Sequence, residues 1–127
     1  MSRGTWLLLA LAVAACGDDA EECTTEFRVA TVFVEDQAGA PVTDAGVQTY
    51  LGRTGELVPV TTLIDLLPGH YPILDDNATS LIHSSAEPFR VTAVRGAGTP
   101  VEAPYTFRTP NGCHIEKVSG PDTLVVP

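Results

Sequence analysis

The side chains that could ligate a metal or act as nucleophiles are widely separated in this sequence. The three histidines are His70, His83 and His114, and they form no H-x-H or H-E-x-x-H spacing of the kind that holds a transition metal. Ser84 and Ser85 follow His83, but neighbouring residues on a strand point to opposite faces, and no G-x-S-x-G elbow is present. The pattern therefore predicts no metal centre and no serine hydrolase, with the histidines at strand ends or in loops.

One acidic run, Asp75-Asp76-Asn77, supplies oxygen atoms of the type that calcium prefers. It lacks the alternating ligands and the closing glutamate of an EF-hand. Aspartate and asparagine also favour turns, because their side chains bond to the nearby backbone. The run is interpreted as a turn, with a weak calcium site as the alternative.

Cysteine is the remaining reactive type, at Cys16, Cys23 and Cys113. Cys16 ends the run MSRGTWLLLALAVAAC, in which Arg3 precedes an apolar stretch and then small residues. That order is typical of an export signal. The apolar stretch is too short to cross a bilayer, which needs about 20 residues.

The position of Cys16 directly after Val13, Ala14 and Ala15 resembles a bacterial lipobox, the processing site of membrane-anchored lipoproteins. The resemblance implies that residues 1–15 are a lipoprotein signal peptide and that Cys16 carries diacylglycerol and fatty acid, such as palmitate. In some bacteria an aspartate directly after the lipidated cysteine marks retention in the inner membrane. In this chain the aspartate, Asp18, comes one place later, which favours the outer membrane. Plain secretion, which would leave Cys16 as a free thiol, stays open.

If Cys16 carries lipid, an even pair of cysteines remains, and exported proteins normally oxidise such a pair. We expect a disulfide between Cys23 and Cys113, with two buried free thiols or a metal-binding pair as the alternatives; the spacing has no C-x-x-C character that would favour zinc. In the chain-entropy description, closing so long a loop stabilises the fold by about 4–5 kcal/mol.

The net charge of −9 excludes nucleic acid as a partner, because acidic domains repel phosphates. Residues 16–22 contain Asp18, Asp19, Glu21 and Glu22 and are interpreted as a lipidated acidic tether. Residues 23–127 then form a single domain of ordinary size.

The body of the chain consists of short runs rich in valine and threonine with turn residues between them, which predicts an all-β fold. We expect a single antiparallel β-sandwich, transthyretin- or immunoglobulin-like, of about seven to eight strands. Segments 61–67 and 79–86 are each a loop or one helical turn, and Pro110-Asn111-Gly112 is a turn. The predicted strands are 27–35, 45–51, 56–60, 70–74, 89–95, 105–109, 113–118 and 123–126.

Residues 36–47 fit the pattern D-x-x-G-x-P-V-x-x-A-x-V, and Gly69-His70-Tyr71 follows later. These motifs resemble the opening hairpin and a later strand of carboxypeptidase regulatory-like domains, which have a transthyretin-like sandwich. The resemblance implies an accessory module that is not catalytic. The order of the strands after Phe89 stays open.

Carbohydrate binding requires exposed aromatic faces, and the one tryptophan, Trp6, lies in the signal segment. Tyr50 and Tyr71 are the candidate ligand-binding residues. The four phenylalanines fall in strand patterns and are expected in the core; they are Phe27, Phe33, Phe89 and Phe107.

Together these observations predict a lipid-anchored, non-catalytic β-sandwich module of the bacterial cell envelope, with a binding or structural role and no cofactor. Its partners would be the membrane, through the lipid, and an envelope protein or glycan. Two alternatives remain. One is a low-affinity carbohydrate-binding module, and the other is a small envelope enzyme whose site, including Asp75 and His83, lies in the loops between Leu74 and Phe89.

Overall fold

The computed structural model describes residues 23–61 and 66–127. The predicted signal peptide, the lipidation of Cys16 and the acidic tether lie outside the described residues, as does part of segment 61–67. Within the described ranges, no helix is both long and apolar enough to span a bilayer.

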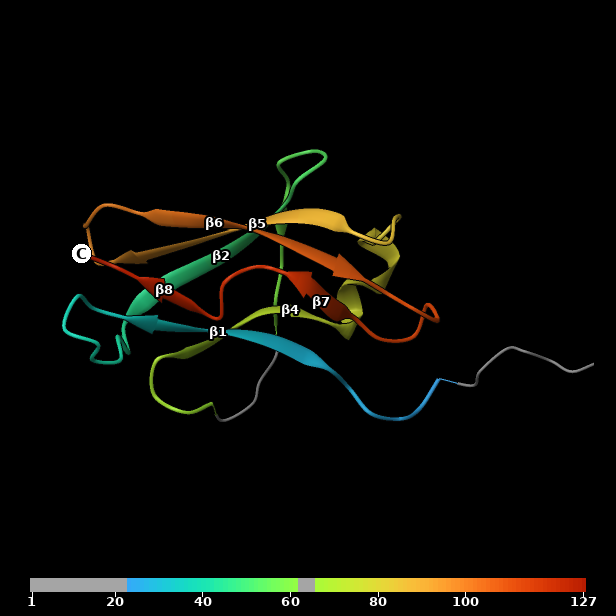
Figure 1. The fold of residues 1–127 in the computed structure, drawn as a ribbon, viewed down its shortest axis with the longest axis horizontal. Helices are drawn as coiled ribbons and strands as arrows, with labels where there is room; N and C mark the ends of the chain where they lie inside the picture. Colours follow the sequence, from blue (N-terminus) through green and yellow to red (C-terminus); the bar gives the residue numbers. More distant parts are fainter. Residues whose placement is uncertain (1–22, 62–65) are drawn as a thin grey trace, which may run out of the picture.

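The described chain forms a β-sandwich of two sheets, as predicted (Figure 1). One sheet has three strands in the order β4-β1-β8, and the other has five in the order β3-β2-β5-β6-β7. A 3₁₀ helix, η1 (Asp76–Leu81), follows β4. The strands are β1 (Val29–Glu35), β2 (Ala45–Leu51), β3 (Leu57–Val58), β4 (His70–Asp75), β5 (Glu87–Arg95), β6 (Val101–Arg108), β7 (Glu116–Ser119) and β8 (Thr123–Val125).

Each predicted strand overlaps an observed one, but the sandwich is not wholly antiparallel. β8 runs parallel to β1, with Phe33 opposite Thr123 and Glu35 opposite Val125. Parallel neighbours need a crossover connection. Here the chain leaves β1 for β2 and β3 in the five-stranded sheet, returns to the three-stranded sheet as β4, crosses back for β5, β6 and β7, and reaches β8 last.

The core lies between the sheets and follows the alternation of the strands. In β5, Phe89, Val91 and Ala93 are buried while the residues between them are more exposed. The ring of Phe89 meets the edge of Phe107 on β6, with ring centroids 5.6 Å apart. The prediction of core phenylalanines is confirmed for these two residues.

The other two phenylalanines depart from that prediction to different degrees. Phe33 is half-buried and packs against His70, with the two rings tilted and their centroids 5.1 Å apart. Phe27 is 51% exposed, so its placement in the core was wrong. The physical reason is that β1 begins only at Val29, which leaves Phe27 ahead of the layered part of the fold.

Two side chains join the sheets along the side where β2 meets β4. The Thr49 hydroxyl donates to the carbonyl of Ile73 at 2.6 Å. The Tyr71 hydroxyl donates to the carbonyl of Val42 at 2.6 Å and accepts from the amide of Ala45 at 3.0 Å. This side of the sandwich is therefore closed by buried and half-buried hydrogen bonds.

The two turns expected from sequence are present. In the first, the Asp36 carboxylate accepts the amides of Ala38 and Ala40, and Gly39 has a φ of 82°. In the second, the amide of Gly112 donates to the carbonyl of Thr109 at 3.1 Å. Positive φ is the conformation that glycine adopts at no steric cost.

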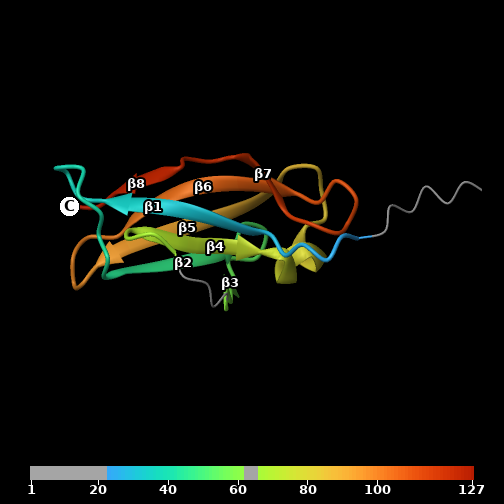
Figure 2. The same cartoon turned by 90° about the horizontal axis from the view of Figure 1, so that it is seen from below.

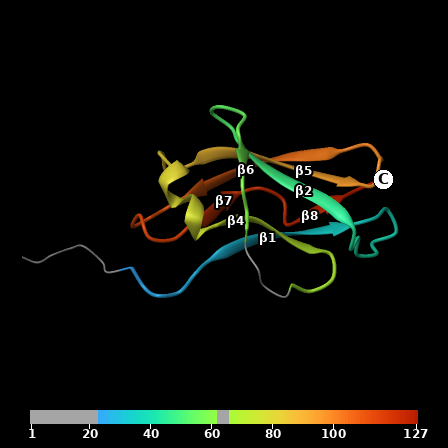
Figure 3. The same cartoon turned by 180° about the vertical axis from the view of Figure 1, so that it is seen from behind.

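The acidic run forms the start of the helix η1. Asp75 caps the helix, because its side chain accepts the amide of Asn77 at 2.9 Å. The run is thus a turn that starts a 3₁₀ helix. Figure 3 shows η1 at the end of the sandwich where β1 begins, and Figures 1 and 2 show the C-terminus at the opposite end.

Candidate functional site

The first described residues are fixed to the C-terminal part of the chain by a group of contacts that we call the N-terminal staple. Its covalent member is the predicted disulfide, Cys23–Cys113, whose Cα atoms lie 5.2 Å apart. That separation is ordinary for a disulfide. The staple comprises Cys23, Thr24, Arg28, Asp76, Cys113, His114 and Ile115.

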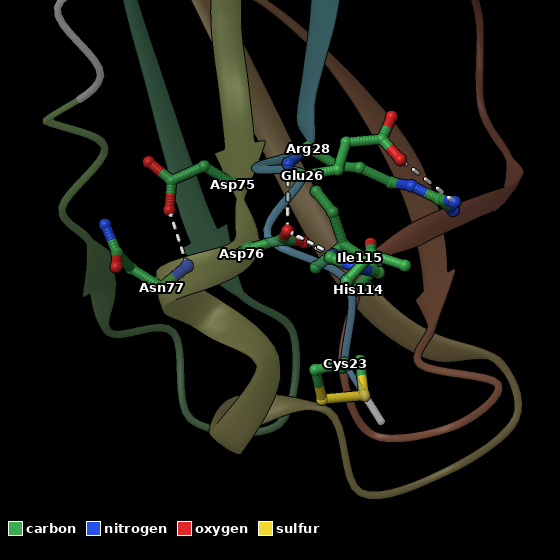
Figure 4. A network of polar contacts seen from close by, with 10 residues as sticks. Cys23, Glu26, Arg28, Asp75, Asp76, Asn77, His114 and Ile115 are labelled. Carbon is green, nitrogen blue, oxygen red and sulfur yellow. Dashed lines mark hydrogen bonds and ion pairs between the residues drawn. A yellow bond between two sulfur atoms is a disulfide. The ribbon is translucent and has the colours of Figure 1, made fainter. Parts of the chain in front are cut away.

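The centre of the staple is the carboxylate of Asp76, which lies between three segments of the chain (Figure 4). One oxygen, Oδ2, accepts the amide of Arg28 at 2.8 Å and contacts His114 Nδ1 at 2.6 Å. The other, Oδ1, accepts the amide of Ile115 at 2.8 Å. A single nearly buried side chain therefore joins the segment before β1, the start of η1 and the segment before β7.

These contacts determine the charge of Asp76. Burial alone would raise the pKa of its carboxyl, but the hydrogen bonds from the Arg28 amide, His114 and the Ile115 amide, with the electrostatic attraction of His114, lower the pKa below its usual value. Hydrogen bonds to the charged form stabilise that form. Asp76 is therefore a carboxylate at neutral pH.

The imidazole of His114 extends the network to the exposed Thr24. Its Nε2 lies 2.8 Å from Thr24 Oγ1, while Nδ1 faces Asp76. Because a carboxylate accepts only, a neutral His114 carries its proton on Nδ1, and its Nε2 then accepts the Thr24 hydroxyl proton. The order hydroxyl–imidazole–carboxylate is that of a nucleophile, a base and an orienting acid.

The surroundings of this chain of hydrogen bonds bear on its chemistry. A cavity of about 270 Å³ lies beside it, lined among others by Thr24, Pro110, Asn111 and His114. Acyl transfer also needs donors for the oxyanion, usually backbone amides. The amides of Arg28 and Ile115 both donate to Asp76 and are not free to serve in that way.

The three histidines do not converge. His70 opens β4 against Phe33, and His83 lies after η1 with its Nε2 3.1 Å from the carbonyl of Ser80. The backbone amide of His83 donates to Glu87, which is paired with Arg53. Across the described ranges, no group of three or more His, Cys, Asp or Glu side chains is placed to hold a metal ion.

The two tyrosines considered for sugar binding both make internal contacts. The Tyr71 hydroxyl is engaged in joining the sheets. The Arg90 guanidinium on β5 covers one face of the Tyr50 ring on β2, 4.7 Å from the ring centroid. The Tyr50 hydroxyl donates to Gln48 at 2.8 Å. The two rings come from different sheets, and we find no shared platform between them.

Sequence reasoning missed the pairing of Asp76 with His114. The residues are 38 positions apart and form no recognisable motif. The contact of Thr24 with His114 did have a signal, because each residue directly follows a cysteine of the predicted Cys23–Cys113 disulfide.

Comparisons with known proteins leave the family of this chain open. No protein-family model matches it, and neither a curated protein nor a solved structure matches it. The resemblance to carboxypeptidase regulatory-like domains therefore stays a prediction.

Proposed function

We propose that this chain is a lipid-anchored, non-catalytic β-sandwich module of the bacterial cell envelope, which binds an envelope partner or has a structural role there. The observation that carries the proposal is the N-terminal staple. It fixes the sandwich to the chain at Cys23, a short distance after the lipobox-like Cys16.

The distance between these two cysteines limits where the module would work. A flexible tether over residues 16–22 has a reach on the order of 15 Å. With lipid on Cys16, the sandwich would stay next to its membrane, and the stapled end would face the bilayer. Acyl chains supply stable anchoring, since each buried CH₂ contributes about 0.8 kcal/mol.

A binding or structural role, instead of catalysis, is supported by the way the polar groups at the staple are used. The Asp76 carboxylate accepts from backbone amides on both sides of the site, and such contacts hold chain segments together. The resemblance of residues 36–47 to an accessory domain supports the same role.

The decisive test of the anchor is the intact mass of protein purified from membranes and alkylated without reduction. We expect a chain that begins at Cys16, carries the mass of the lipid, and takes no alkyl group on Cys23 or Cys113. A Cys16→Ala variant should lose the lipid mass and leave the membrane fraction. A lipid-free mass with an alkylated Cys16 would overturn the proposal in favour of plain secretion.

One observation favours a second candidate, a small envelope hydrolase. The hydrogen-bonded chain Thr24–His114–Asp76 has the order of a catalytic triad beside a cavity. Hydrolysis of p-nitrophenyl acetate by the purified protein and by its Thr24→Ala variant separates the two functions. Equal rates support the non-catalytic module, whereas turnover that is lost with Thr24→Ala and kept with Thr24→Ser would establish the hydrolase.

A further inference from the structure

One edge of β1 is covered along only part of its length. The ladder between β1 and β8 begins at Phe33 and continues to Glu35. Within residues 23–61 and 66–127, the first half of β1 has no strand beside it on this edge, although β4 pairs with the opposite edge from Val29 to Phe33. Figure 1 shows β8 alongside the C-terminal end of β1 only.

The direction of the backbone groups follows from the bonds that are made. Phe33 donates its amide to Asp122 on the β8 side, and the carbonyl of Glu35 accepts from Val126 on the same side. Because successive peptide groups point to opposite edges, the amides and carbonyls of Val29 and Thr31 also face this side. In the described part of the chain, no backbone group pairs with them there.

These unpaired groups open into a groove of about 430 Å³. One wall is the segment from Glu26 to Thr31, and the other is formed by Ile115 and Lys117. The half-exposed ring of Phe27 is part of the lining. The groove therefore combines a free hydrogen-bonding edge with an apolar contact, the two features that strand addition uses.

The other edges of the sandwich are protected in ways that this one is not. β4 carries Pro72 and is tied to β2 through Tyr71 and Thr49. β3 has only two residues and β7 four. Proline and shortness are among the usual protections of an edge. The N-terminal half of β1 has no proline and belongs to a seven-residue strand, and the irregularity between Ala30 and Thr31 lies in its ladder with β4, on the opposite edge.

The charges at the rim select the partner. In the pair Arg28–Glu26 the carboxylate side chain is 63% exposed and the guanidinium side chain 47%. In the pair Lys117–Asp122 the difference is larger, with the carboxylate side chain 91% exposed and the ammonium side chain 28%. The groove itself is lined by Glu26, Arg28 and Lys117, and Asp122 pairs with Lys117 beside it. Cations and carboxylates are equal in number in these two pairs, but the carboxylate is the more exposed member of each, in a chain whose net charge is −9. A basic segment complements these exposed carboxylates.

We propose that the groove binds an extended, basic segment of a partner polypeptide, which adds to the three-stranded sheet along Val29–Thr31. The proposal rests on the binding role proposed above and names its partner class. The segment would lie in line with β8 and pair with the amides and carbonyls of Val29 and Thr31. Its lysine or arginine side chains would meet Glu26 and Asp122.

The probe is a fluorescent peptide of alternating lysine, valine and threonine, titrated into the lipidated full chain in detergent and followed by anisotropy. We expect saturable binding that weakens with salt, since exposed charges are screened. A peptide with glutamate in place of lysine, and one N-methylated at alternate residues, should bind about tenfold more weakly or not at all. Equal binding of all three peptides would contradict strand addition.

Variants of the protein locate the site. Thr31→Pro removes an amide that faces the groove, and Phe27→Ser removes the apolar contact; both should weaken binding about tenfold. Leu57→Ser on β3 is the matched control, because Leu57 is 55% exposed and Phe27 51%. It should bind as the parent does. Loss with Leu57→Ser, with no effect of Phe27→Ser, would place the site elsewhere and overturn the proposal.

Failure here is distinguishable from failure of the proposed function. A pull-down with the lipidated chain tests whether an envelope partner exists at all. Recovery of a partner by the parent and equally by Thr31→Pro and Phe27→Ser would keep the binding module and reject the β1 edge. No binding of the lysine peptide at millimolar concentration would also reject the edge, whatever the pull-down shows.

Discussion

His114 Nδ1 lies 2.6 Å from Asp76 Oδ2, and this contact joins parts of the chain that are 38 positions apart. Around it, the backbone amides of Arg28 and Ile115 complete the shell of the carboxylate. The pair therefore stabilises the arrangement of three chain segments at once. Its removal should lower the stability of the whole fold and not only disturb the two side chains.

Asp76→Asn is expected to destabilise the fold by about 2–3 kcal/mol, because hydrogen bonds to a charged group are worth more than neutral ones. The amide keeps the shape of the side chain but cannot accept from both amides and His114 as a carboxylate does. Urea unfolding measures the change. Asp44→Asn, at an exposed ion pair with Arg95, is the control and should change stability by less than about 1 kcal/mol.

The same carboxylate makes stability dependent on acid pH. Since the pKa of Asp76 is lower in the folded chain than the ordinary 3.8, its contribution is present above that value and is lost as the pH falls below it toward the folded-state pKa. Unfolding followed between about pH 5 and pH 2 should show this loss. The Asp76→Asn variant should show a flatter profile, and an unchanged profile would contradict the role given to Asp76.

Gly120→Ala should be strongly destabilising because of Tyr105. A Cβ at Gly120 would lie only 2.2 Å from the buried Tyr105 ring, and Gly120 has a φ of 131°. Gly96→Ala is the matched control, since its φ of 56° is also positive but the space beside it is open. We expect about 1–2 kcal/mol for Gly96→Ala from the backbone alone. Gly120→Ala should cost a further 1–3 kcal/mol or so from overpacking, and thermal unfolding of both measures the difference.

Reduction of the Cys23–Cys113 disulfide should lower the free energy of unfolding by about 4–5 kcal/mol in the chain-entropy description. The double variant Cys23→Ser, Cys113→Ser should behave like the reduced chain in denaturant. If His114 and Asp76 hold the segment without the disulfide, the amide of Arg28 will remain protected from hydrogen exchange in that variant. Loss of this protection would show that the covalent bond is needed to form the staple.

The sequence determined the fold well where local pattern and local structure agree. The expected strand 89–95 overlaps β5, and Phe89 lies in the core as expected. The turn residues located the turn after β1, which leads to β2 in the other sheet instead of closing a hairpin between these two strands. The start of β6 was missed by the prediction, which began that strand at Tyr105. Proline normally interrupts a strand because it cannot donate to the ladder, and Pro104 therefore argued against an earlier start. On the edge of β6 that faces β7, however, the ladder covers only Thr106–Arg108, so Pro104 lies beside an unpaired stretch of that edge.

The candidate site was less accessible to sequence reasoning, because its members are assembled by topology. The even number of cysteines that remains after Cys16 predicted the disulfide between Cys23 and Cys113, which is present. Nothing in the local pattern around Asp76 indicates that it lies against His114, since the contact depends on how η1 packs beside the segment before β7. Asp76 was interpreted only as part of a turn, which it is, but it also holds the staple together.

The disulfide has a consequence for how the domain would respond to a mechanical load. A pull on the chain ahead of Cys23 passes through the covalent bond to Cys113, which lies between β6 and β7. The load is therefore shared between the peptide chain that leads to β1 and the segment before β7 in the five-stranded sheet, where β5 and β6 carry much of the buried core. While the disulfide is intact, a pull cannot separate β1 from its neighbours starting at its N-terminal end. In a reducing environment the same pull would break the hydrogen bonds of β1 one after another.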